Sequence, residues 1–403
     1  MKSTDNIKIT MDTVIIKIYS PRTFKISNFS LFLPEITRRT YEELSPTERS
    51  SRHPYLKRFV LKPKFQEDYL PRVELFETLT KDRKNIQHIL KIELSIPKLL
   101  YWNSVQEVSD MDQQRVFSAL RSALQSVGIT IETEIISKAQ VVAVHACKNI
   151  LLPKNIRMRE IINELGKIDI SKVFDISDKQ NKKGSRVLNI YAGTTDWSIY
   201  DKVSDSLRPK NKRTDKDHID YERQFIISHN LEDKEIFRYE YRIKKNQTAR
   251  KYINPLLGRD YETQLLFKDL FTPNLMKSLV INSWHTIINR PENQLSLFAT
   301  TNKLTLLLHI LAEAQKINKK SHTLNKALIS YGLAIAINDH GAKEVRGAIF
   351  DIWDTNHPER LNKKIELASE LIQGLPYSNG ISFINNSLEN FEFINLTSLG
   401  KGI

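Results

Sequence analysis

The stretch Asn189–Lys202, N-I-Y-A-G-T-T-D-W-S-I-Y-D-K, is the most informative part of this 403-residue sequence. Its β-prone composition predicts a β-hairpin over Arg186–Tyr200. A second run, Phe237–Lys245 (F-R-Y-E-Y-R-I-K-K), alternates charged and apolar side chains, which is typical of a strand. A tyrosine at a strand end, a strand with a carboxylate and several cations together suit a reaction in which a tyrosine attacks a DNA phosphate.

Tyr200 lies directly before Asp201 and Lys202. A phenol with an ordinary pKa of about 10 is a poor nucleophile until a metal or a nearby cation stabilises its anion. If the strand continues through Lys202, this side chain shares the face of Tyr200 and supplies part of that stabilisation. The alternative is a tyrosine that packs at a strand end beside an exposed lysine.

The charged residues of the second strand are Arg238, Glu240 and Arg242. Strand alternation places all three on one face, where buried charges need partners because an unpaired buried charge is costly. In an active site the carboxylate would hold a metal and the arginines would bind the scissile phosphate. A surface ladder of salt bridges is the alternative.

Basic residues dominate the composition, with 61 Lys and Arg against 47 Asp and Glu, a net charge of +14 and a pI near 9.5. Such an excess favours an anionic partner, most often nucleic acid, although a solubilising basic surface has the same composition. The segment after Lys202 is also basic, and we expect four of its residues to contact the DNA backbone. These are Arg208, Lys210, Lys212 and Arg213.

Two further residues are candidate metal ligands. Glu93 is the one acid in an apolar strand, L-K-I-E-L-S, and His145 lies between Val144 and Ala146. A single histidine in a strand is also common as a hydrogen-bonded core residue, so both interpretations of His145 stay open. The sequence has no P-loop and no His-x-His pair, which excludes a P-loop helicase and the two-histidine metal strand of many nickases.

No internal repeat is evident in the sequence. The predicted elements change near residue 260, from mostly strands before it to helices beyond it. Before it, we predict strands and two helices, at Asp110–Gly128 and Met158–Gly166. The predicted strands are Thr13–Tyr19, Phe59–Leu61, Arg72–Phe76, His88–Ser95, Ile129–Ile136, Ala139–Ala146, Phe225–Ser228 and Phe237–Lys244, with a loop at Val203–Asp220. Beyond it, we predict the helices Glu262–Leu270, Asn274–Asn289, Lys303–Lys319, Leu324–Asn338 and Ala342–Trp353. The expected fold is α+β: a sheet domain with flanking helices (1–260) and an all-helical domain (261–403).

Localisation is expected to be cytoplasmic. No run approaches the roughly 18 apolar residues of a membrane helix, and the first residues lack the apolar core of a secretory signal. The single cysteine, Cys147, excludes an internal disulfide and fits a reducing compartment.

Taken in order, these motifs resemble the replication-initiator and relaxase family that includes the filamentous-phage gene II replication endonuclease. More distantly, they are similar to the rolling-circle initiators of plasmids and conjugative transposons. The resemblance runs from M-D-T-V-I-I-K-I-Y (Met11–Tyr19) through I-E-L-S-I-P-K-L-L, the hairpin and F-R-Y-E-Y-R-I-K-K to about Asn289. In one departure, Ser137–Gln140 (S-K-A-Q) stands where the family tends to have an arginine-x-acid strand.

The resemblance implies an antiparallel nickase-type domain in which Tyr200 is the nucleophile and Glu93 and Glu240 are acidic active-site residues. It implies rolling-circle initiation, with metal-dependent nicking of an origin through a 5′-phosphotyrosine intermediate. The expected cofactor is Mg²⁺ or Mn²⁺, with His145 as a possible substitute for the missing acid. The partners would be origin DNA, single-stranded or supercoiled, together with a host helicase and polymerase, and no membrane.

Two alternatives remain. The first is a non-catalytic DNA-binding regulator of replication or transcription in a phage or mobile element. In that case the helices Leu324–Asn338 and Ala342–Trp353, with the turn at residues 339–341, would form a helix-turn-helix. The second is an RNA-binding protein, because aromatic strands with basic loops also suit single-stranded RNA.

Overall fold

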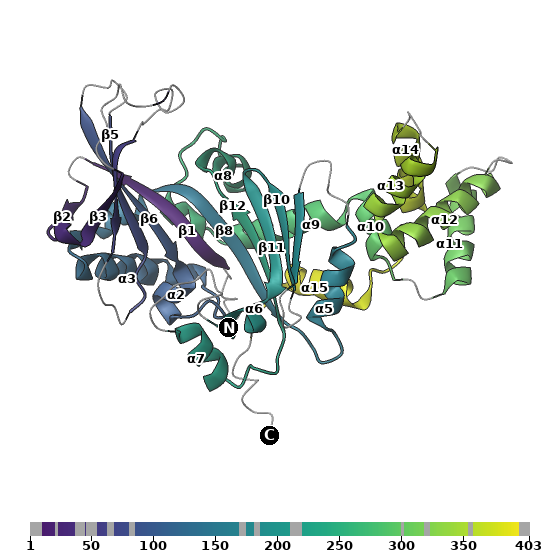
Figure 1. The fold of residues 1–403 in the computed structure, drawn as a ribbon, viewed down its shortest axis with the longest axis horizontal. Coiled ribbons are helices and arrows are strands. Elements are labelled where there is room, and N and C mark those ends of the chain that lie inside the picture. The colour runs from purple at the N-terminus through teal and green to yellow at the C-terminus, as the bar shows by residue number, and fades with distance from the viewer. Residues whose placement is uncertain are drawn as a thin grey trace, which may run out of the picture.

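The computed structural model shows a long, curved sheet flanked by helices, with a cluster of helices at one end (Figure 1). It describes residues 10–20, 23–36, 45, 55–62, 68–79, 85–168, 175–180, 186–209, 220–299, 302–317, 323–353 and 358–394. The architecture confirms the expected α+β class and the antiparallel sheet.

Ten strands form the main sheet, and every neighbouring pair is antiparallel. In spatial order they are β3 (Phe32–Ile36), β4 (Tyr55–Leu61), β5 (Arg72–Leu79), β6 (Ile86–Ser95), β1 (Met11–Tyr19), β8 (Gln140–Leu151), β12 (Ile236–Ile243), β11 (Thr195–Asp201), β10 (Arg186–Ala192) and β9 (Asp175–Gln180). A separate short pair joins β2 (Lys25–Ile26) to β7 (Ile129–Thr130).

The strand order repeats across the middle of the sheet. On one side β1 is followed in the chain by β3, β4, β5 and β6, which lie side by side and return β6 to pair with β1. On the other side β8 is followed by β9, β10, β11 and β12, and β12 returns to pair with β8. Because β1 and β8 pair antiparallel, the two halves are related by an approximate twofold axis between them. The topology therefore contains an internal repeat that the sequence does not reveal.

The two faces of the sheet differ in chemistry. On β12, Phe237, Tyr239 and Tyr241 face one side, where Trp284 of α9 (Leu275–Ile288) makes edge-to-face contacts with the first two rings. This apolar face belongs to a large core shared with α3 (Gln113–Ser126), α5 (Met158–Leu165), α8 (Asn246–Ile253) and α15 (Asn379–Asn390). The other face carries the polar and charged residues of β12, because strand side chains alternate.

A second hydrophobic core lies within the helices at the far end of the molecule (Figure 1). It joins α10 (Pro291–Leu297), α11 (Lys303–Ile317), α12 (Thr323–His340), α13 (Ala342–Trp353) and α14 (Pro358–Leu371). The expected division near residue 260 falls earlier than the division between the cores. Leu265 to Ile288 still belong to the sheet core, and α15 returns to it after the helical unit. The helical unit is thus an insertion between α9 and α15.

Local structure differs from the sequence prediction in three places away from Tyr200. The predicted strand Ile129–Ile136 ends after Thr130 and gives way to the helix α4 (Thr133–Ser137). The predicted strand Phe225–Ser228 is part of the helix α7 (Tyr221–Ser228), which buries Glu222 and Ile226 four residues apart. The predicted helix Glu262–Leu270 is a turn followed by a 3₁₀ segment, Phe267–Phe271. In each case tertiary packing overrides the local propensity.

Gly341 connects α12 to α13 with a backbone φ of +90°. A Cβ at this position would lie 2.8 Å from the backbone oxygen of Lys167, which follows α5. The close approach joins the helical unit to the sheet unit, and only glycine satisfies both the backbone angle and the contact.

We predict that Gly341→Ala lowers the free energy of unfolding by about 1–3 kcal/mol, because the new methyl group meets a carbonyl in a strained backbone conformation. Gly347→Ala is the matched control in the next helix. A Cβ there has open space, so the change should raise stability by about 0.5–1 kcal/mol. Urea unfolding of both variants measures the difference; equal stabilities would contradict the close approach.

Candidate active site

Tyr200 is the last residue but one of β11 and lies opposite Arg238 of β12. Its side chain is 9% exposed, and its hydroxyl donates a hydrogen bond of 2.7 Å to Glu240 Oε1. Burial first, and then the negative charge of Glu240, raise the pKa of Tyr200 well above its ordinary value. Tyr200 is therefore a neutral hydrogen-bond donor near neutral pH.

Glu240 lies between two arginines of its own strand, as the alternation predicts. Its Oε1 accepts a bond of 2.6 Å from Arg238 Nε, in addition to the bond from Tyr200. Its Oε2 accepts a hydrogen bond of 2.8 Å from Arg242 Nε and a second hydrogen bond from the same guanidinium. Burial alone would raise the pKa of Glu240, but Arg242 and Arg238 hold it well below the ordinary value. We call Tyr200, Arg238, Glu240 and Arg242 the Tyr200 cluster.

Arg238 connects this cluster to the rest of the fold. Its guanidinium is 1% exposed and donates to the backbone oxygen of Ser104 (2.7 Å) and to Asn149 Oδ1 (3.1 Å). It also forms a salt bridge of 3.1 Å with Asp12 of β1, which in turn accepts a bond from Ser95. Asp12 was not predicted as a site residue. Its position as a lone acid at the start of the first strand was the available signal.

Lys202 does not extend the strand, so the expectation that it shares a face with Tyr200 is wrong. Asp201 instead caps the helix α6 (Lys202–Ser206), since its carboxylate accepts bonds from the backbone nitrogens of Val203 and Ser204. The buried ammonium of Lys202 lies 2.9 Å from Glu222 of α7. This helix also corrects part of the predicted loop Val203–Asp220.

Glu222 links Lys202 to the Tyr200 cluster through one residue. Its Oε1 accepts bonds from the backbone nitrogen of Ser104, at 3.1 Å, and from the Ser104 hydroxyl. The backbone oxygen of Ser104 is the acceptor for Arg238. Burial would raise the pKa of Glu222, but the cations Lys202 and Lys98 hold it below its usual range. Lys202 thus acts on Tyr200 only through this intervening network.

The residues that were expected to hold a metal are not brought together. Glu93 shares the polar face with Glu240 but lies three strands away, a separation of roughly 14 Å across the sheet. His145 lies opposite Arg242 on β8, and both oxygens of Glu240 already accept bonds from the arginines. Within the described ranges, no group of three or more His, Cys, Asp or Glu side chains is placed to hold a metal ion. These residues as placed do not fit a metal centre.

The basic segment after α6 is described only in part. Arg208 is partly exposed and forms a salt bridge of 3.2 Å with Asp205. The other three predicted DNA contacts, Lys210, Lys212 and Arg213, lie outside the described residues.

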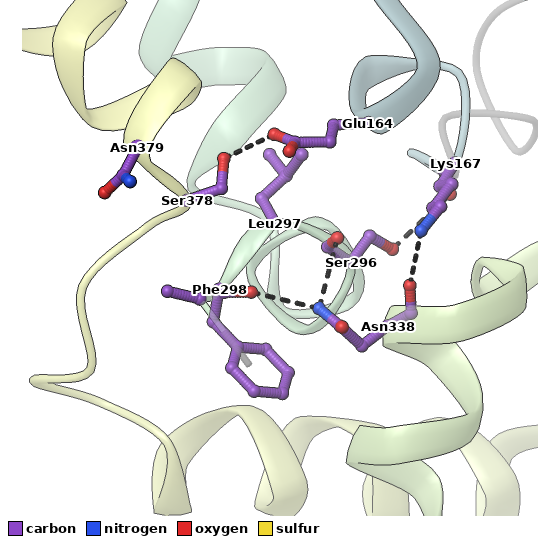
Figure 2. Close-up of a pocket in the computed structure, with 9 residues that line it drawn as sticks. Glu164, Lys167, Ser296, Leu297, Phe298, Asn338, Ser378 and Asn379 are labelled. Carbon is purple, nitrogen blue, oxygen red and sulfur yellow. Dashed lines mark hydrogen bonds between the residues drawn. The ribbon is translucent and has the colours of Figure 1, made fainter. Parts of the chain in front are cut away.

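A cavity of about 330 Å³ lies between the sheet unit and the helical unit and shares no residue with the Tyr200 cluster (Figure 2). On one wall the Ser378 hydroxyl donates a hydrogen bond to Glu164. On the other, Lys167 Nζ donates a hydrogen bond of 2.8 Å to the backbone oxygen of Asn338. Burial raises the pKa of Glu164. The bond from Lys167 to Asn338 of α12 crosses the boundary and joins the two units.

No model of a known protein family matches the sequence, and no curated protein matches it. Of the helices that the structure describes, none is both long enough and apolar enough to cross a membrane.

His145 provides a test of the electrostatics around the cluster. Burial first, and then the charge of Arg242, lower the pKa of His145 from 6.5 to about 4. Between these values the unfolded chain binds the proton more readily than the folded chain, so stability falls as the pH falls. We predict a loss on the order of 1–3 kcal/mol between pH 6.5 and 4, and a flatter curve for His145→Gln.

The measurement is urea unfolding at a series of pH values. His88→Gln, which replaces a histidine with a 46% exposed side chain on β6, is the control and should reproduce the wild-type curve. An unchanged slope in His145→Gln would show that His145 is not held neutral by its surroundings.

Proposed function

We propose that this chain is a rolling-circle DNA replication initiator that nicks a DNA strand and transfers it through a phosphotyrosine bond to Tyr200. The observation that carries the proposal is the hydrogen bond from Tyr200 to Glu240, made beside two guanidinium groups. A tyrosine that attacks a phosphodiester needs a proton acceptor and cations for the charge that develops on the phosphate. One pair of neighbouring strands supplies both.

In the reaction we propose, a DNA phosphate approaches the polar face and binds Arg242, whose side chain is 33% exposed. The Tyr200 oxygen attacks phosphorus while its proton passes to Glu240. The bond from phosphorus to the 3′ oxygen breaks, and that oxygen takes a proton from water to become a free 3′-hydroxyl. One phosphoester bond replaces another, so the strand can be rejoined without ATP.

The resting cluster is unreactive because Glu240 is a weak base while two arginines bind it. A phosphate that competes for Arg242 removes one of these cations from Glu240. The pKa of Glu240 then rises towards its ordinary value, and the carboxylate becomes a better acceptor for the phenolic proton. The same arginine stabilises negative charge on the phosphate. Arrival of the substrate would thus activate the nucleophile.

A divalent metal remains a prediction. When bound, such an ion would offset charge on the phosphate. Because the candidate ligands Glu93, Glu240 and His145 are not gathered, no step above passes through a metal.

We predict that Tyr200→Phe lowers nicking of supercoiled origin DNA by on the order of 1,000-fold or more, because the attacking oxygen is removed. Folding and DNA binding should persist, since Glu240 keeps both arginines. A denaturing gel should show a protein–DNA adduct in the wild type and none in the variant. The matched control is Tyr191→Phe on β10. Tyr191 is 36% exposed and lies on the same face of the sheet as Tyr200, and its substitution should leave nicking unchanged.

An adduct that persists in Tyr200→Phe would sink the assignment of the nucleophile. Wild-type protein that binds DNA but never nicks it would favour the non-catalytic regulator, and a preference for RNA oligonucleotides would favour the RNA-binding alternative. Adding excess chelator tests the metal separately. Nicking should stop if the ion is required, and full activity would overturn that expectation.

A further inference from the structure

Two aromatic side chains stack at the junction of α2 (Ile96–Tyr101) and α7, next to the Tyr200 cluster. The rings of Trp102 and Tyr221 lie 5.2 Å apart with an interplanar angle of 28°. Trp102 is 49% exposed, whereas Trp197 and Trp284 are buried. A large aromatic ring that is half exposed and supported by a second ring is suited to stacking against a further flat group.

The backbone of Trp102 makes this residue unusual. It ends α2 in the left-handed conformation, with φ 60° and ψ 7°, and its nitrogen bonds to the backbone oxygen of Lys98. Glycine is the residue usually found in this conformation at a helix end, and other residues adopt it at a cost of about 1–2 kcal/mol. A tryptophan at this position is therefore unfavourable in two ways: its backbone adopts a conformation that favours glycine, and half of its apolar ring remains exposed to water. Such residues concentrate at functional sites.

The segments that carry the two rings are connected to the proposed active site through Ser104 and Glu222. Trp102 precedes Ser104 by two residues, and Tyr221 directly precedes Glu222. Ser104 bonds to Glu222 through its nitrogen and hydroxyl, and its carbonyl accepts from Arg238. Ser104 thus links the segments that carry both rings to the guanidinium beside Tyr200.

We propose that Trp102 and Tyr221 form a stacking platform for an unpaired nucleobase of single-stranded DNA whose phosphate lies at the Tyr200 cluster. Bases in a duplex stack on each other, so only an unpaired base presents its face to a protein ring. The exposed cation Arg223 follows Tyr221, and the net charge of +14 favours a polyanion over an apolar partner. This inference rests on the proposed function and adds to it the two residues that would hold an unpaired base beside the nucleophile.

The first experiment measures binding of a fluorescent single-stranded oligonucleotide by anisotropy. Trp102→Gly removes the ring and relieves the backbone, so the fold should be retained, as a thermal melt would verify. Affinity should fall about 5- to 100-fold. Trp102→Tyr keeps a stacking ring and should stay near wild type. Tyr261→Ala serves as the control. It removes a 59% exposed ring from the segment before Leu266, which pairs with Gln140 at the start of β8, whereas Asn149 of the Arg238 network lies near the end of that strand.

The second experiment replaces the bases by abasic sites while keeping every phosphate. Wild-type protein should bind the abasic strand more weakly than the intact strand. Trp102→Gly should bind both strands equally well, because it has already lost the stacking interaction. Tryptophan fluorescence should be quenched by the intact strand, and the quench should shrink in Trp102→Tyr.

The outcomes separate the platform from the proposed function. If Trp102→Gly binds the intact strand as tightly as wild type, the platform is wrong, whether or not the wild type nicks DNA. If it binds more weakly only to the intact strand while no adduct forms on Tyr200, the platform stands and the nucleophile is wrong. An equal loss on the intact and abasic strands would show that Trp102 supports the backbone site and not a base, which overturns the inference.

Discussion

Arg238 holds a full positive charge in the middle of the sheet, with 1% of its surface exposed. Withdrawal of a guanidinium from water costs several kcal/mol, and this cost is offset only when its donors find acceptors with good geometry. Four groups supply them: Glu240, Asp12, Asn149 and the carbonyl of Ser104. They come from β12, β1, β8 and the segment after α2. Removal of any one leaves a buried donor without its partner, so the four elements depend on each other.

This dependence explains why the site lies where the two halves of the sheet meet. Asp12 is at the start of β1 and Asn149 near the end of β8, the two strands that pair across the centre. A slip of one residue in either strand would turn its polar side chain to the apolar face. The buried charge therefore favours a single register at the seam of the repeat. Apolar packing against the helices of the large core buries the opposite face of the sheet, while the polar network specifies alignment.

Much of the cluster could be predicted from the sequence because its members are close in the chain or alternate on one strand. Arg238, Glu240 and Arg242 obey the period of two, and Tyr200 ends the predicted hairpin. Tyr200 comes to lie opposite Arg238 because β11 pairs with β12, which the hairpin does not determine. The two-residue alternation also led to the wrong expectation for Lys202, because Asp201 caps the helix α6 and so ends the strand before Lys202. Glu93 shares the correct face but lies too far across it. Asp12, Ser104 and Trp102 could not be placed, since strand order and long-range pairing decide their neighbours, and local patterns carry no signal for either.

The interactions that stabilise the cluster also oppose its chemistry. Two arginines make Glu240 a poor base, and burial beside Glu240 makes Tyr200 a weak acid. In the proposed mechanism, the cluster would therefore be inert until a substrate binds. Arg242 is the member whose side chain is most exposed, so the proposed phosphate would reach it without uncovering Arg238. In the proposed reaction, Arg238 would maintain the register of the strands while Arg242 binds the phosphate. This division of roles would allow the sheet to remain folded while the electrostatics at Tyr200 change.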